Sequence, residues 1–244
     1  MSALVYVLPV HQEEKVLEGN VLRLREHLEG EDAEIFLVEN GSSDRSWELS
    51  QSLEERWGDA APPVRAFREA DAGIGYAYHR GLTEALERFG PSPDRWAILT
   101  AADLPFGMTD LEAARPLLST TRPRILMGSK AHPRSQADRG AKRKVMSAAF
   151  RLLRRAIIDM RVGDSQGSVF VRLDLAAELL PTIRARGFFY STELCHRAET
   201  LGEDIVELPV SLFPSGRAST VRPLKHGSEM GRELLRLRRE ARRG

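Results

Sequence analysis

Short apolar segments alternate with helical patterns through the first half of the chain, and this alternation constrains the fold more than any other feature. Residues 3–10 (ALVYVLPV) form a continuous apolar run, which is typical of a strand buried on both faces. Residues 13–28 then place apolar side chains along one side of a helix. The pattern continues with strand-type segments at 33–40, 63–70, 96–103 and 124–130 and helices at 43–57 and 75–89. The sequence therefore predicts an α/β fold with a mainly parallel sheet flanked by helices.

The second half of the chain follows a different pattern. Residues 145–160 combine an apolar stripe with arginines outside it, which predicts a basic amphipathic helix, and residues 204–213 predict a late strand. A chain of 244 residues with 42% hydrophobic content can form one large domain. We assign residues 1–225 to this domain and expect a basic C-terminal helix or tail at 226–244. The single cysteine, Cys195, lies in a helical pattern and is expected in the core.

Basic residues are concentrated in two segments, although the net charge is only +1. Residues 130–161 hold ten Lys or Arg against two Asp, and residues 215–244 hold nine against three Glu. This concentration predicts an anionic partner, whether phosphate groups, an anionic membrane or nucleic acid. Nucleic acid is the least favoured of the three, because aromatic residues for base stacking are scarce among these arginines.

The sequence also bears on the compartment. No apolar run reaches the roughly 18 residues that cross a bilayer, so any membrane contact is expected to be peripheral. The one cysteine allows no internal disulfide, and the first ten residues lack the basic region and cleavage site of a secretory signal. We therefore expect a cytoplasmic protein, with or without peripheral contact to the cytoplasmic face of a membrane.

Acidic and polar side chains follow three of the predicted strands. They occur in the segments Pro9–Glu13, Glu39–Asp44 and Ala101–Asp103. A nucleotide diphosphate site needs an acceptor for a base N–H, a flat group against the base and a carboxylate for a divalent cation. Glu39 or Asn40, His11 and Asp103 supply these groups in turn. The alternative is that such residues only cap helices and form turns, as they often do after strands.

These segments, in this order, resemble the family 2 glycosyltransferases of GT-A fold. The family patterns P-x-Y-N-E, V-D-D-G-S-x-D-x-T and N-x-G-x-G-x-A-x-x-x-G correspond to residues 9–13, 38–46 and 71–81. The resemblance implies a nucleotide-sugar donor and a divalent cation, Mg²⁺ or Mn²⁺, with Asp103 as the metal carboxylate. The donor-binding residues that it implies are Pro9, His11, Glu13, Glu39, Asn40, Asp44, Gly73, Gly75, Ala102 and Asp103.

Later segments resemble the polyprenyl-phosphate glycosyltransferases of this family in particular. Asp164-Ser165-Gln166-Gly167 is similar to D-x-Q-x-G, Gly128-Ser129-Lys130 to G-S-R, and the segment around Glu193 to F-D-x-E-L-L. The resemblance implies catalytic roles for Asp164, Gln166 and Glu193. It also implies that an acceptor phosphate or the diphosphate is bound by Lys130, Arg139, Arg143, Arg217, Ser219 and Arg222.

The sequence departs from the family pattern at informative places. Ala101 replaces the first Asp of the D-x-D motif, and Ser191 replaces the Asp two residues before Glu193. Asp103 alone can hold a cation on a diphosphate, because such a cation often needs only one or two carboxylates. The competing reading is a nucleotide-binding relative that has lost catalysis.

The resemblance implies inverting transfer of a hexose from a UDP- or GDP-sugar to a polyprenyl phosphate at the membrane surface. Residues 142–161 are then expected to form a membrane-surface helix, with Arg151, Arg154 and Arg155 outside its apolar stripe and suited to anionic headgroups. The alternative for this helix is packing on the sheet with its arginines in water. The alternative acceptor is soluble, such as a glycan or a secondary metabolite, and Asp164 or Glu193 would then be the base.

Overall fold

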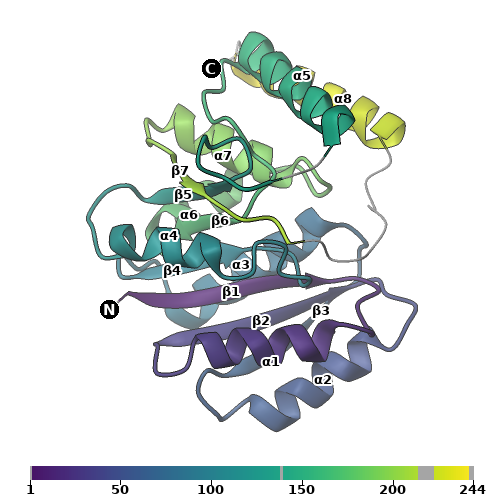
Figure 1. Ribbon diagram of the computed structural model, residues 1–244, viewed down its shortest axis with the longest axis vertical. Coiled ribbons are helices and arrows are strands. Elements are labelled where there is room, and N and C mark those ends of the chain that lie inside the picture. The colour runs from purple at the N-terminus through teal and green to yellow at the C-terminus, as the bar shows by residue number, and fades with distance from the viewer. Residues whose placement is uncertain (1, 138–139, 214–222, 242–244) are drawn as a thin grey trace.

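A seven-stranded sheet forms the centre of the molecule (Figure 1). The computed structural model describes residues 2–137, 140–213 and 223–241, and of residues 141–143 and 223–228 only the backbone. Within these residues the strand order is β3-β2-β1-β4-β6-β5-β7. The strands are β1 (Ala3–Val10), β2 (Ala33–Asn40), β3 (Val64–Glu69), β4 (Arg95–Leu99), β5 (Ile125–Ser129), β6 (Val169–Arg172) and β7 (Val206–Pro209).

The sheet is mainly parallel, as the sequence predicts. Strand β6 runs antiparallel to β4 and β5, and the other neighbouring strands are parallel. The five strand-type segments of the first half are all strands in the structure. Sequence patterns did not predict β6, which is only four residues long. Its insertion between β4 and β5 places the residues before β6 at the edge where the parallel strands end.

Helices cover both faces of the sheet and make it the middle of three layers (Figure 1). Alternate residues of β1 enter two different cores. Val5 and Val7 pack with α3, α6, α7 and α8, whereas Leu4, Tyr6 and Leu8 pack with α1, α2 and α4. The helices are α1 (Leu17–His27), α2 (Ser46–Trp57), α3 (Ile74–Phe89), α4 (Thr109–Leu118), α5 (Gly140–Ile158), α6 (Leu173–Leu179), α7 (Tyr190–Thr200) and α8 (Pro223–Ala241).

Helix α3 lies directly on β1. A Cβ atom at Gly81 would come within 2.2 Å of the Val7 Cγ1 atom, so a larger residue at this position would push the helix away from the sheet. The close packing fixes the start of α3 beside the ends of β1 and β2. Helices α4 and α6, like β6, were not predicted from sequence patterns.

The C-terminal segment packs on the domain. Leu234 and Leu237 of α8 are 0% and 1% exposed and belong to the core that also contains α3 and α7. Helix α8 lies beside α5 at one end of the molecule (Figure 1). Among the described residues, no helix combines the length and the apolar character that crossing a membrane requires.

The basic helix expected at 145–160 is present as α5, but one of its arginines is not in solvent. Arg154 is 2% exposed, which corrects its expected position outside the helix's buried side. The reason is that the chain after α5 folds back over it: Arg154 donates to the Met160 Sδ at 3.1 Å and to the Gly163 carbonyl at 3.0 Å. In contrast, Val145 and Leu152 are 67% and 66% exposed.

Candidate active site

The predicted site residues gather along one edge of the sheet. The carboxyl ends of β1, β2, β4 and β5 meet at this edge because these strands all run in the same direction. The antiparallel strand β6 begins at the same edge. The loop residues His11, Asp103, Lys130 and Gln166 therefore lie in one row with Asn40, the last residue of β2, at the edge where ligands of such sheets bind.

Hydrogen bonds tie the loop after β1 to the loop after β2. The His11 Nδ1 atom lies 3.0 Å from the Asn40 carbonyl oxygen, and the Glu13 amide donates to the Ser46 Oγ at 2.8 Å. Asp44 accepts from the amides of Glu14 and Ser46. Partial burial opposes ionisation of Asp44, but these hydrogen bonds hold its pKa below the ordinary value. Asp44 thus stabilises the two loops against each other.

The end of β2 carries two buried acceptor oxygens. Glu39 is 1% exposed; its Oε1 accepts from the Ser42 amide at 2.5 Å, and its Oε2 lies 3.3 Å from the Arg68 Nε. Within the described part of the chain, Asn40 Oδ1 accepts no hydrogen bond, and Glu39 Oε2 has the Arg68 ion pair but no hydrogen bond. A buried acceptor without a donor is costly, so a ligand N–H at this position would be stabilising. Pro9 of β1, which is buried, lies opposite Val38 of β2, the residue before Glu39 and Asn40.

The glycines before α3 make room for another part of the protein. A Cβ atom at Gly75 would come within 2.5 Å of the Arg186 backbone, and the Tyr76 amide donates to the Arg186 carbonyl at 3.1 Å. Gly73 has φ +150°, which favours glycine. The two glycines therefore let residues 184–188 cross the start of α3, and their predicted role in donor binding stays a prediction.

Asp103 lies in the loop after β4, next to the buried Ala102. The Tyr78 hydroxyl of α3 is buried, which raises its pKa, and the negative charge of Asp103 raises it further, so the two side chains are near one another. Across the described residues, no group of three or more His, Cys, Asp or Glu side chains is arranged to share a metal ion. A cation at Asp103 would therefore need most of its ligands from a bound molecule and water.

Asp164 is held in a network at the start of β6. Its Oδ2 accepts from the Lys130 backbone amide at 3.0 Å and lies 2.9 Å from the Lys130 Nζ, while its Oδ1 accepts from the Gln166 amide at 2.9 Å. Burial opposes ionisation of Asp164, but the Lys130 charge and these hydrogen bonds hold its pKa below the ordinary value. Gln166 donates to the Phe188 carbonyl and to the Thr192 hydroxyl. Asp164 is therefore a carboxylate at neutral pH.

Glu193 lies inside the protein rather than at the edge. It is 0% exposed and accepts from the Ala185 amide at 2.7 Å. Both of its oxygens also bind arginines, Arg197 of α7 and Arg236 of α8. Despite burial, these donors hold its pKa below the ordinary value. We therefore propose that Glu193 positions the segment 184–188 instead of acting as a base.

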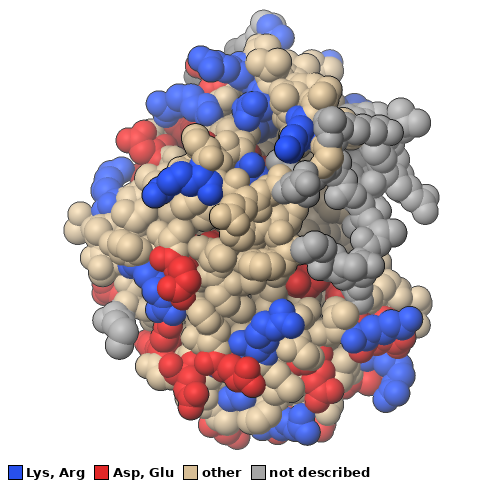
Figure 2. All heavy atoms as spheres, viewed as in Figure 1, with Lys and Arg blue, Asp and Glu red and all other residues tan. Residues whose placement is uncertain are grey.

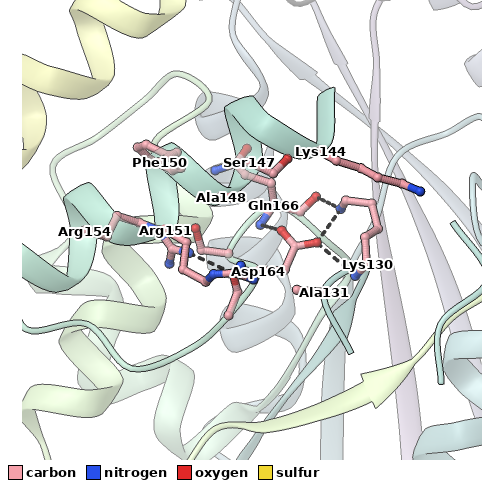
Figure 3. A pocket seen from close by; sticks show the side chains of 12 residues that line it. Lys130, Ala131, Lys144, Ser147, Ala148, Phe150, Arg151, Arg154, Asp164 and Gln166 are labelled. Atoms are coloured by element: carbon pink, nitrogen blue, oxygen red, sulfur yellow. Dashed lines mark hydrogen bonds and ion pairs between the residues drawn. The ribbon is translucent and has the colours of Figure 1, made fainter. Parts of the chain in front are cut away.

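A basic pocket of about 230 Å³ lies between α5 and the turn before β6 (Figure 3). Lys130, Lys144, Arg151, Arg154 and Asp164 supply its charged lining. Sequence reasoning assigned Arg151 and Arg154 to contact with anionic headgroups rather than to a pocket, and it gave Lys144 no individual role. Their spacing of seven and then three residues, which keeps them on one side of a helix, is the pattern that could have identified them.

Several predicted phosphate-binding residues cannot be compared with the structure. Arg139, Arg217, Ser219 and Arg222 lie outside the described residues, and the side chain of Arg143 does as well. On the face seen in Figure 2, Lys and Arg side chains predominate over the part where Figure 1 places α5 and α8. The concentration of positive charge predicted for this half of the chain is thus visible in the described residues.

The fold and the matched segments identify the class. The chain belongs to glycosyl transferase family 2, because the model of that family matches residues 6–171. It is a glycosyltransferase with the GT-A fold, as the resemblance in its strand-end loops implied.

Solved structures of one enzyme resemble the chain over nearly its whole length. The structure of glucosyl-3-phosphoglycerate synthase from Mycobacterium tuberculosis with Mn²⁺, UDP and glucosyl-3-phosphoglycerate has a TM-score of 0.65 at 19% identity, covering 96% of this chain and 77% of that one. Its complex with Mn²⁺, UDP-glucose and phosphoglyceric acid has a TM-score of 0.66 at 18% identity, covering 97% and 79%. Its complex with Mg²⁺ and UDP has a TM-score of 0.63 at 18% identity, covering 96% and 77%. At these identities the similarity establishes the shared fold.

Proposed function

We propose that this glycosyltransferase moves a hexose from a UDP-sugar to a small soluble acceptor, with inversion at the anomeric carbon. The choice of a UDP-sugar as donor rests on two buried acceptor oxygens at the end of β2, Glu39 Oε2 and Asn40 Oδ1. The imide N–H of uracil matches such oxygens, and the exposed His11 ring beside Asn40 offers a flat surface for the base. The UDP complexes of the mycobacterial synthase support this choice of donor.

The carboxylate of Asp103 suits a divalent cation that would accompany the donor diphosphate. Asp103 would hold it, and diphosphate oxygens and water would complete its ligands, which is common for Mg²⁺. When bound, the cation supplies positive charge that stabilises the leaving diphosphate. The Mn²⁺ and Mg²⁺ complexes of the synthase support its presence. Because Ala101 removes one carboxylate of the family motif, we expect weaker cation binding than in relatives that retain it.

In the proposed transfer, an acceptor hydroxyl oxygen bonds to the anomeric carbon while the bond from that carbon to the diphosphate oxygen breaks. UDP leaves with the bonding electrons, and the hydroxyl proton passes to Asp164. This carboxylate lines the basic pocket and is ionised at neutral pH. Its Oδ1 accepts one backbone hydrogen bond among the described residues, so a lone pair remains for the proton. Its low pKa makes it a weak base, so the positive charges around it also have to position the acceptor.

A polyprenyl phosphate is the second candidate acceptor, and the exposed apolar side chains of α5 favour it. Val145, Leu152 and Leu153 are 67%, 66% and 44% exposed on a helix rich in arginine, a combination that suits an anionic membrane surface. Replacement of Val145 and Leu152 by Ser should abolish co-sedimentation with anionic vesicles if this candidate is correct. Negligible vesicle binding by the unaltered protein would remove the membrane role and leave the soluble acceptor.

A donor and acceptor screen tests the proposal. Nucleotide release is measured from UDP- and GDP-sugars, each alone, with phosphoglyceric acid, and with a polyprenyl phosphate. The proposal expects release from UDP-sugars that a soluble acceptor accelerates. Acceleration by polyprenyl phosphate alone would contradict the acceptor half of the proposal, and use of GDP-sugars alone would contradict the donor half.

A further inference from the structure

Arg154 is a buried arginine that forms no ion pair with the described residues, and its guanidinium carbon lies 5.2 Å from the centre of the Phe150 ring. The residue is 2% exposed, and its guanidinium donates to two neutral acceptors, the Met160 sulfur and the Gly163 carbonyl. Its Nε makes no hydrogen bond, and no carboxylate in the described part of the chain forms an ion pair with it. Burial lowers the pKa of Arg154, although the negative charges of Asp164, Glu199 and Glu207 raise it in part. Buried charges are normally paired, so the arrangement leaves room for a partner beyond the described residues, such as a bound anion.

The pocket that Arg154 lines is basic and small. Lys130, Lys144 and Arg151 line it as well, against the single carboxylate of Asp164 (Figure 3). Lys130 already binds Asp164, so Lys144, Arg151 and Arg154 remain as the positive groups for a ligand. Arg151 and Lys144 are exposed at the rim, whereas Arg154 lies at the buried side. The volume of about 230 Å³ suits a phosphate group on a short carbon chain, since a liquid water molecule occupies about 30 Å³.

We propose that this pocket binds the anionic group of the acceptor, a phosphate monoester, between Arg154 at its base and Arg151 and Lys144 at its rim. The inference rests on the proposed function, because it identifies the bound anion as part of the acceptor. Phosphate offers several oxygens to the fork of donors on each guanidinium, which suits two converging arginines better than a single lysine. Asp164, in the same lining, then faces the organic part of the acceptor and not its phosphate, because two anions repel each other. The pocket thereby selects phosphorylated acceptors and orients their hydroxyl groups.

Binding of phosphoglyceric acid without any donor tests the pocket directly. Calorimetric titrations compare phosphoglyceric acid, glyceric acid and inorganic phosphate on the unaltered protein and on Arg151→Gln, Arg154→Met and Arg155→Gln. Arg155 is the matched control, because it is an exposed arginine of α5 that does not line the pocket. Loss of one charge-assisted contact should weaken phosphoglyceric acid about tenfold in Arg151→Gln and at least as much in Arg154→Met. Arg155→Gln should bind it within about twofold of the unaltered protein by the same scale.

A second measurement separates a binding role for Arg154 from a structural one. Because Arg154 is buried without an ion pair, Met at this position should leave the protein as stable as before or more stable, while phosphate binding falls. Co-sedimentation with vesicles of equal phosphatidylglycerol and phosphatidylcholine distinguishes the source of the phosphate. Vesicle binding that Arg151→Gln abolishes together with phosphoglyceric acid binding would assign the pocket to a lipid headgroup, and loss of phosphoglyceric acid binding alone would assign it to a free phosphate ester.

The two proposals can fail separately. Equal affinity of all three variants for phosphoglyceric acid, with donor turnover intact, would overturn the pocket and leave the proposed function standing. Weakened binding in the two pocket variants, without nucleotide release from any UDP-sugar, would support the pocket as an anion site and contradict the proposed function.

Discussion

Replacement of Glu193 by Gln distinguishes a positioning role from a catalytic one. Glu193 is a fully buried carboxylate that accepts from Ala185, Arg197 and Arg236, and so joins α7, α8 and the segment that crosses the start of α3. Gln has the shape of Glu but no charge. Its amide NH₂ would face N–H donors such as Arg197 and Arg236, to which it cannot offer an acceptor. The arginines would then keep their charge without their central partner.

The expected loss of stability is large. Breaking a buried ion pair by removing one partner costs about 3–5 kcal/mol, which is a large share of the roughly 5–15 kcal/mol that stabilises a domain. With a urea m-value of about 3 kcal/mol/M for a chain of this size, the unfolding midpoint should fall by roughly 1–1.7 M. Because the folded-state pKa of Glu193 is lowered, its stabilisation is complete above the unfolded pKa and is lost as the pH falls through the folded pKa.

Urea titrations at pH 7, followed by tryptophan fluorescence, to which the buried Trp96 contributes, measure this change. Glu178→Gln is the control, because Glu178 pairs with Arg124 at a half-exposed position and should change stability by less than about 1 kcal/mol. A catalytic base would give the opposite result. If Glu193→Gln unfolds at the same urea concentration as the unaltered protein but loses turnover at saturating donor, the positioning role is refuted.

Three further predictions follow from individual contacts. Asp103→Asn should weaken UDP binding about tenfold in the presence of Mn²⁺ and leave it unchanged without metal in calorimetry; equal loss in both conditions would remove Asp103 as the metal ligand. Gly167→Ala should lower stability by about 3 kcal/mol, because its Cβ would lie 1.7 Å from the Gly128 carbonyl oxygen, whereas Gly19→Ala in open space within α1 should raise it by about 0.5–1 kcal/mol in thermal unfolding. Burial and the charge of Arg186 lower the pKa of His79 to about 4 in the folded protein. As the pH falls from 6.5 toward 4, the His79 ring is therefore protonated in the unfolded chain but stays neutral in the folded protein. Stability should drop by about 1–2 kcal/mol over that window, allowing for the partial exposure of the ring, and a His79→Gln variant that drops equally would contradict this assignment.

The row of loops at the sheet edge could be predicted because its determinants are local. The continuous apolar run of residues 3–10 and the largely apolar segment 33–40 favour buried strands, and the helices that connect the strands favour a parallel arrangement. Parallel strands end at one edge whatever the details of packing, so His11, Glu39 and Asp103 had to lie in the same row. The matches to family motifs in these loops added the class of enzyme.

The sequence did not predict the strand pairing and the ion pairs of the second half of the chain. Strand β6 is a four-residue segment that is stabilised by pairing with β4 and β5, and such non-local pairing leaves no periodic pattern. Glu193 and Arg236 are separated by 43 residues, so their ion pair could not be read from spacing. The motif around Glu193 was visible, but its burial was not.

The sequence by itself thus determined strands β1 to β5, helices α1 to α3 and the sheet edge where their loops meet, because periodicity records which side of each element faces a core. Only the tertiary structure decided the state of each charged group. Arg151, Arg154 and Arg155 are alike in sequence, and a helical pattern places all three outside the apolar stripe. The chain after α5 turns back over one of them, so Arg154 is 2% exposed while Arg151 and Arg155 remain in solvent. Burial and pairing depend on which distant segments cover a side chain, and that depends on the packing of the whole fold rather than on any local pattern.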